Sequence, residues 1–203
     1  GDVYKRQQYN VASLNSYSSF GLNETADILL SGFGLNDSGG KLKINHPVSV
    51  SSNGEKLAVT DRFNNRILIW NSIPNQKTAP DIVIGQKNFD THNSGNGLDE
   101  LDFPGQVIIT PDAKLLVADS DNDRVLVWTN FPQTSGQTAD YAIPITNYVS
   151  MNNSWPWGVR SDGNKTIVTA TVSGTILIWN SFPGSNTAPD VVLTSNPVSY
   201  THL

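Results

Sequence analysis

The chain has 203 residues with 13 lysines and arginines against 18 aspartates and glutamates, and this mildly acidic balance gives no electrostatic reason to expect nucleic acid as a partner. It contains no cysteine, which excludes disulfides, cysteine nucleophiles and thiolate metal sites. No uninterrupted apolar run approaches the length of a membrane span, so we expect no membrane insertion.

The two ends of the chain are related at the level of DNA. Residues 2–7 can be encoded by a string whose reverse complement encodes Ser199-Tyr200-Thr201-His202, so both ends resemble a transposon-end adapter translated in opposite directions. We therefore expect residues 1–7 and 198–203 to be adapter-like scars. Residues 8–197 are then an internal piece of a longer protein. The alternative is that both ends are ordinary polar termini.

Residues 8–31 resemble the tail of a repeat unit. The motif Thr25-Ala26-Asp27, followed by apolar residues, returns three times later in the chain. The later copies are Thr78-Ala79-Pro80-Asp81, Thr138-Ala139-Asp140 and Thr187-Ala188-Pro189-Asp190. We expect each copy to lead into an outer strand, the first of which belongs to a unit that is otherwise missing.

Three later units each open with a ring side chain followed by proline, at His46-Pro47, Phe103-Pro104 and Trp155-Pro156. Proline fixes its own φ and favours an extended residue before it, so it suits the start of a strand. Hairpin turn residues then separate two predicted strands in each unit. The first strands are expected at 48–51, 107–110 and 158–160, and the second at 57–60, 115–118 and 166–169.

A polar turn and a third, apolar strand closed by tryptophan complete the pattern. It reads VTDRFNNRILIW at residues 59–70, VADSDNDRVLVW at 117–128 and, more loosely, TATVSGTILIW at 169–179. The continuous apolar run indicates a strand buried on both faces. The turn can bring Asp61 to Arg66 and Asp119 to Arg124, whereas the third copy has no such pair.

Four short strands in each unit, repeated at nearly constant spacing, predict an all-β radial array. Proline before the first strand and the V-A-D-x-x-N-x-R-V-L-V-W pattern resemble the NHL-repeat family. The resemblance implies a partial β-propeller over residues 8–197, with about three four-stranded blades plus the outer strand of a preceding one. Because most members of that family close six blades, it implies an open arc. A complete four-bladed ring is the alternative.

The repeated Asp–Arg pairs favour a structural role, because a catalytic group occurs once in an active site whereas these pairs recur with the repeat. The alternating Asp119, Asp121 and Asp123 are a weak calcium candidate. The string lacks the glycine and the glutamate that a calcium loop carries.

No catalytic motif is visible in the sequence, and we expect no cofactor, no metal and no catalytic residue. Amidating lyases related to the NHL family bind zinc through several histidines. His46 and His92 are too few for such a site once His202 is assigned to the adapter-like end.

In a four-stranded blade, the connection into the first strand and the turn between the second and third strands lie at the same end. The ring residues and the polar turns should therefore share one face, where we look for a ligand. The candidate ligand-face residues are His46, Arg62, Phe63, His92, Phe103, Asp121, Asp123, Trp155 and Trp157. The alternative is ordinary surface. Trp70, Trp128 and Trp179 close third strands and should serve packing.

These features predict a non-catalytic binding scaffold that engages a protein or glycan partner through loops on one face. Its other partners would be the remaining blades of its own full-length chain. The similarity to bacterial NHL proteins implies an extracellular or periplasmic location. The alternative is a propeller lyase or hydrolase whose metal or acid–base residues lie in missing blades. RNA binding would need a basic face, against which the acidic balance argues.

Overall fold

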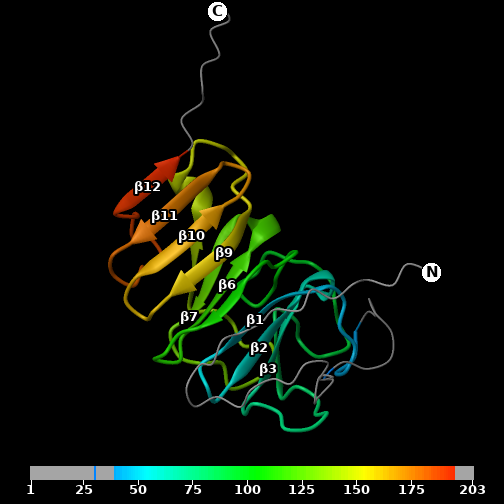
Figure 1. Ribbon diagram of the computed structural model, residues 1–203. Coiled ribbons are helices and arrows are strands. Elements are labelled where there is room, and N and C mark those ends of the chain that lie inside the picture. The colour runs from blue at the N-terminus through cyan, green and yellow to red at the C-terminus, as the bar shows by residue number, and fades with distance from the viewer. Residues whose placement is uncertain (1–29, 31–38, 195–203) are drawn as a thin grey trace, which may run out of the picture.

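Each repeat of the sequence folds into four strands because turn residues separate its apolar runs at hairpin spacing. The computed structural model describes residue 30 and residues 39–194 (Figure 1). Blade 1 consists of β1 (Pro47–Ser52), β2 (Leu57–Asp61), β3 (Arg66–Trp70) and β4 (Ile82–Ile84). Blade 2 consists of β5 (Val107–Ile109), β6 (Leu115–Asp119), β7 (Arg124–Trp128) and β8 (Tyr141–Pro144). Blade 3 consists of β9 (Pro156–Ser161), β10 (Thr166–Ala170), β11 (Thr175–Trp179) and β12 (Val191–Thr194).

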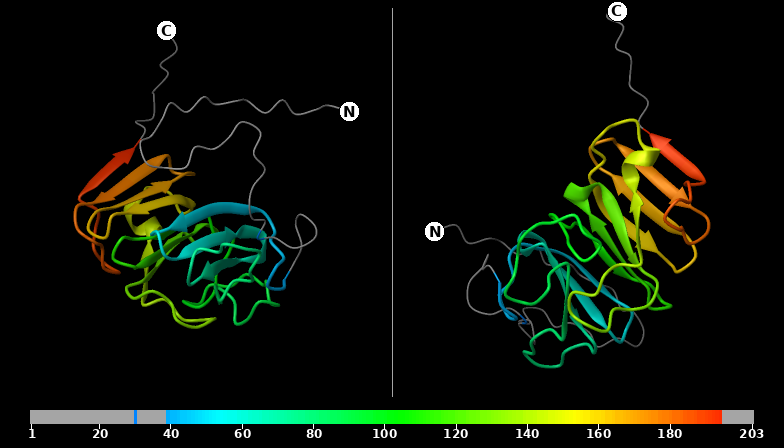
Figure 2. Two further views of the ribbon diagram at one scale, coloured as in Figure 1. Left: turned by 60° about the horizontal axis from the view of Figure 1, so that its bottom comes forward. Right: turned by 180° about the vertical axis from the view of Figure 1, so that it is seen from behind.

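Every blade is one antiparallel sheet in which the strands are neighbours in chain order. Three short 3-10 turns complete the described elements: η1 (Arg62–Asn64), η2 (Ser120–Asn122) and η3 (Ile145–Tyr148). Figures 1 and 2 show the green strands of blade 2 between the cyan strands of blade 1 and the yellow to red strands of blade 3. The expected all-β, partial β-propeller architecture is confirmed.

The register of the second hairpin is the same in all three blades. Its strands pair Leu57 with Trp70, Leu115 with Trp128 and Thr166 with Trp179. At the turn end of the same hairpins, Asp61 lies opposite Arg66 and Asp119 opposite Arg124, while Ala170 lies opposite Thr175. The hairpin therefore brings each Asp and Arg together, as the sequence predicted.

The core lies between the blades. One cluster joins blades 1 and 2, and a second joins blades 2 and 3. Trp70, Trp128 and Trp179 are buried, and their indole Nε1 atoms donate to backbone carbonyls 2.9, 3.1 and 2.8 Å away. The packing role expected for these tryptophans is confirmed. Trp128 packs between blades 1 and 2, Trp179 packs between blades 2 and 3, and Trp70 packs with Leu68 and Val83.

The start of the blades agrees with the expectation only in part. Strand β5 begins at Val107 as expected, whereas β1 and β9 already begin at Pro47 and Pro156. The ring residue before each proline is not extended: His46, Phe103 and Trp155 have φ angles of 55°, 44° and 47°. This left-handed backbone is unfavourable for a residue with a side chain, so tertiary interactions must hold it there.

Some predictions concern parts of the chain that lie outside the described residues. These are the adapter-like scars at 1–7 and 198–203 and the outer strand expected from Asp27. Among the residues that are described, no helix is long and apolar enough to cross a membrane.

The outer face of blade 3 is apolar and exposed. Ile167 and Ile176 are 41% and 38% exposed, whereas Leu116 and Val125, which occupy the same repeat positions in blade 2, are fully buried against blade 3. The exposed face is thus of the kind that forms an interface between neighbouring blades.

We predict opposite effects for the same substitution at these equivalent positions. Ile176→Glu should change the free energy of unfolding by no more than about 0.5 kcal/mol and should reduce the binding of a hydrophobic dye. Val125→Glu buries a charge and should abolish cooperative unfolding. Urea denaturation followed by circular dichroism, with dye fluorescence, measures both. Equal destabilisation by the two substitutions would contradict this account of the exposed face.

Candidate functional site

The turn after β2 is anchored by a buried ion pair. The Asp61 carboxylate accepts from Arg66 Nε at 2.7 Å and from Asn64 Nδ2 at 2.8 Å. Its other oxygen accepts from the Asn45 backbone N–H at 2.6 Å, one residue before His46. The remaining guanidinium nitrogens donate to the carbonyls of Gly40, Lys43 and Phe89. The pair therefore fixes the loop that leads into blade 1.

Blade 2 repeats this arrangement. Asp119 accepts from Arg124 Nε at 2.8 Å and from the backbone N–H of Asp102 at 2.8 Å, one residue before Phe103. The other guanidinium nitrogens donate to the carbonyls of Asn96, Gly97 and Glu100. Burial raises the pKa of Asp119 to about 6, against the opposing effect of its hydrogen bonds and of Arg124. The carboxylate is thus mainly ionised at pH 7 and pairs with the arginine.

A second polar residue in each turn reaches the next blade. Asn65 Oδ1 accepts from the Phe103 backbone N–H at 2.8 Å, and Asp123 Oδ1 accepts from that of Trp155 at 2.7 Å. Asn65 and Asp123 both have left-handed backbone, which Asn and Asp tolerate better than most residues. These bonds help to hold the next ring residue in its own left-handed conformation, which explains why the local effect of proline is overridden.

The ring residues of the three blades meet at one face, in what we call the aromatic cluster: His46, Phe63, Phe103, Trp155 and Trp157. The ring centroids of His46 and Phe63 are 4.0 Å apart, and those of Phe63 and Phe103 are 5.3 Å apart. Trp155 and Trp157 lie 5.4 Å apart. Phe63 and Trp157 are 40% and 39% exposed, so the cluster offers accessible ring surface.

Arg62 links the parts of the aromatic cluster, although only 6% of the residue is exposed. Its guanidinium carbon lies 5.2, 5.5 and 4.6 Å from the ring centroids of Phe103, Trp155 and Trp157. Its Nη1 donates to the carbonyls of Phe103 and Pro104 at 2.9 and 3.1 Å. Burial lowers the pKa of Arg62, and the charge of Asp121 opposes that shift. One buried cation therefore contacts all three blades.

Two carboxylates stand beside the aromatic cluster. Asp121, on η2, accepts a hydrogen bond from Trp155 Nε1, and its backbone N–H donates to the Asp102 carbonyl at 3.2 Å. Burial raises the pKa of Asp102, and the negative charge of Asp121 raises it further. The site thus combines rings, a guanidinium and carboxylates from neighbouring blades.

Most of the predicted ligand-face residues meet in this site. They are His46, Arg62, Phe63, Phe103, Asp121, Trp155 and Trp157. Asp123 serves instead to hold the loop before blade 3, and the backbone carbonyl of His92 accepts from Asn65 Nδ2 at 3.0 Å. The sequence analysis missed Asn65, although its repeat position, equivalent to that of Asp123, could have identified it.

The three carboxylates of the weak calcium candidate each bind a different part of the protein. Asp119 binds the loop of its own blade, Asp123 that of the next blade, and Asp121 the Trp155 indole. Within residues 39–194 and at residue 30, no group of three or more His, Asp or Glu side chains is placed to hold a metal ion.

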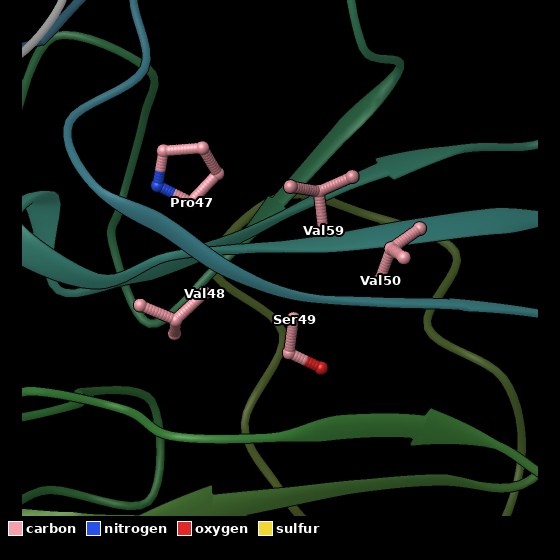
Figure 3. Close-up of a pocket in the computed structure, with 5 residues that line it drawn as sticks. All are labelled: Pro47, Val48, Ser49, Val50 and Val59. Carbon is pink, nitrogen blue, oxygen red and sulfur yellow. The ribbon is translucent and has the colours of Figure 1, made fainter. Parts of the chain in front are cut away.

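A shallow hollow of about 300 Å³ lies along the start of blade 1, lined by Pro47, Val48, Ser49, Val50 and Val59 from β1 and β2 (Figure 3). None of these side chains titrates or carries a charge. We therefore assign the candidate site to the aromatic cluster, where ring surface and charged groups occur together.

No protein-family model and no curated protein matches the chain. Solved structures do. A protein provisionally assigned as a 6-phosphogluconolactonase from Bacteroides uniformis matches with a TM-score of 0.54 and 16% identity, over 76% of this chain and 44% of that chain. The periplasmic gluconolactonase of Pseudomonas aeruginosa matches with a TM-score of 0.53 and 16% identity, over 78% and 45%.

A further provisionally assigned 6-phosphogluconolactonase, from Bacteroides fragilis, has a TM-score of 0.51 and 18% identity, over 76% of this chain and 44% of that chain. The matching region is thus less than half the length of each of these proteins. At these identities the likeness shows the fold, which is of the β-propeller type. The similarity to NHL repeats rests on the sequence pattern alone.

We predict that Asp119→Ala lowers the free energy of unfolding by about 3 kcal/mol, because it leaves the Arg124 guanidinium largely buried without its carboxylate. The matched control is Asp112→Ala, which removes a more exposed carboxylate paired with Lys114 and should cost less than about 1 kcal/mol. Urea denaturation of both variants measures the difference. Equal losses of unfolding free energy in the two variants would show that the buried pair stabilises the fold no more than the exposed pair does.

Proposed function

We propose that the aromatic cluster is a ligand-binding site and that its ligand is a saccharide or a sugar-derived molecule. A sugar ring has an apolar C–H face and a rim of hydroxyl groups, so it suits a site that combines exposed rings with charged hydrogen-bonding groups. Phe63 and Trp157 supply the rings, and Arg62 and Asp121 supply the charges. The convergence of these residues from three blades is the observation that carries the proposal.

A glycan is favoured here over a protein partner. Trp and Arg are also common at the centre of protein interfaces, but a stable protein interface buries about 800 Å² on each side. Arg62 and Asp121 both contact Trp155 of the aromatic cluster, so the charged groups lie next to its rings. That arrangement suits a small polar ring better than a broad, mainly apolar contact.

The second candidate function is that of a propeller hydrolase acting on a sugar lactone. It is supported by the matched structures, which are named as lactonases, and these comparisons favour it over a purely non-catalytic scaffold. Lactone hydrolysis needs a base that activates water and donors that stabilise the oxyanion. His46 lies in the aromatic cluster with its Nδ1 3.0 Å from Asn45 Oδ1, and its imidazole is the candidate base.

The intact protein would then place this site among further blades. Ile167 and Ile176 on the exposed face of blade 3 occupy the repeat positions that in blade 2 are buried against blade 3. We propose that another blade of the full-length protein covers this face. One of the matched structures is periplasmic. We propose an extracellular or periplasmic location for this protein as well.

The proposal is tested by titrating the 203-residue chain with methyl β-D-glucoside, maltotriose and chitotriose and following tryptophan fluorescence. We expect binding of at least one probe, weakened at least about tenfold in Phe63→Ala and Trp157→Ala, a loss of about 1.4 kcal/mol. Val172→Ala is the matched control, because Val172 occupies in blade 3 the turn position that Phe63 has in blade 1. It should bind as the unaltered chain does.

The hydrolase candidate has its own measurement. We expect the rate of glucono-1,5-lactone hydrolysis, followed by pH-stat, to exceed the spontaneous rate and to fall in His46→Gln. Saccharide binding without any rate above the spontaneous one would leave the binding function and remove the hydrolase. A chain that neither binds a probe nor hydrolyses the lactone would contradict the proposed function in both forms.

A further inference from the structure

Arg62 and Ser120 occupy the same position in the repeat, the first residue of the turns η1 and η2, and they make the same contact with the next blade. Ser120 Oγ donates to the Pro156 carbonyl at 2.7 Å. Arg62 Nη1 donates to the Pro104 carbonyl at 3.1 Å. Each bond joins a turn of one blade to the proline at the start of the following blade. A hydroxyl group is therefore sufficient for this structural task.

The guanidinium of Arg62 provides more than that task requires. It carries N–H groups on three nitrogens, of which Nη1 makes the contacts with Phe103 and Pro104. Its Nε and Nη2 donate to no residue in the described part of the chain. Three ring faces and two carbonyls stabilise the charge of Arg62, of which only 6% is exposed. The two nitrogens that donate to no described residue are thus the donors that a ligand would use.

Asp121 provides the complementary acceptor. It occupies the second position of η2, and its charge acts on Arg62, yet the described residues include no ion pair between the two within 4.0 Å. Its Oδ1 accepts from Trp155 Nε1, while Oδ2 accepts no hydrogen bond from a described residue. Donor and acceptor therefore stand near one another without direct contact, beside the rings of Trp155 and Trp157.

We propose that Arg62 and Asp121 together bind a vicinal diol of a saccharide whose apolar face stacks on Trp157. One hydroxyl accepts from the free N–H groups of Arg62, and its neighbour donates to Asp121 Oδ2. Hydroxyl groups suit the pair because each both donates and accepts. The opposite charges balance, so an anionic ligand would meet the Asp121 carboxylate and a cationic ligand the Arg62 guanidinium. This assignment rests on the proposed function.

The repeat itself supplies the decisive variant. Arg62→Ser gives blade 1 the residue that blade 2 carries at this position, so the bond to the Pro104 carbonyl can be kept while the guanidinium is lost. Asp121→Asn keeps the size of an exposed side chain and removes its charge. Ser120→Ala is the control: it removes the equivalent structural bond to Pro156 but leaves Arg62 and Asp121 intact.

The probes are methyl β-D-glucopyranoside, a neutral ring with vicinal hydroxyl groups, and D-glucuronate, in which a carboxylate replaces the hydroxymethyl group of glucose. We expect the glucoside to bind at least tenfold more weakly to Arg62→Ser and to Asp121→Asn. Ser120→Ala should lower the melting temperature but bind the glucoside normally. Glucuronate should bind no more tightly than the glucoside.

The outcomes separate the two proposals. Loss of glucoside binding in Trp157→Ala but not in Arg62→Ser and Asp121→Asn would overturn the diol assignment and leave the sugar site in place. Tighter binding of glucuronate, lost in Arg62→Ser, would show that Arg62 recognises an anion and would also overturn it. If Arg62→Ser fails to fold, the exposed Asp121→Asn decides alone. A chain that binds no saccharide at all contradicts both proposals.

Discussion

The structure depends on one repeated interaction, in which a buried carboxylate holds both an arginine of its own hairpin and a backbone N–H of the loop before the blade. Asp61 and Asp119 each do this. Either bond alone would leave a polar group without a partner in a buried place, which is costly. Together they satisfy the charge and fix the loops that lead into blades 1 and 2. In blade 3, where Ala170 and Thr175 replace the pair, Asp123 of blade 2 holds the corresponding loop instead.

The residues at the ends of these loops have unusual backbone. His46, Phe103 and Trp155 share left-handed φ angles although each precedes a proline. This conformation occurs in all three blades with three different side chains, so it does not depend on which side chain is present. The side chain at this position can therefore vary to suit a ligand. The side chains of the turns vary in the same way. The first two turn positions hold Arg62 and Phe63 in blade 1, and Ser120 and Asp121 in blade 2. The repeat thus provides equivalent positions around one face, and the chemistry of the site comes from the differences between the blades.

Much of this could be predicted from the sequence, and the rest could not for identifiable reasons. The recurrence of Asp119, Arg124 and Trp128 indicated the hairpin register, the buried third strand and the ion pair, because these depend on local pairing within one hairpin. The meeting of ring residues at one face followed from the four-strand topology. Extended backbone was predicted at His46, whereas the structure has left-handed backbone there. The preference set by proline is local, but the hydrogen bond from the Asn45 N–H to Asp61 is tertiary. The position of Arg62 among rings of two other blades also depends on how the blades pack, which periodicity does not specify.

If a saccharide stacks on the aromatic cluster next to Arg62 and Asp121, its protons lie close to those of the rings. A nuclear Overhauser experiment on the 203-residue chain with methyl β-D-glucopyranoside tests this. We expect contacts between the ring C–H protons of the sugar and the side-chain protons of Trp157 and Phe63. Contacts confined to other surfaces, such as the hollow lined by Val48 and Val50, would contradict the claim.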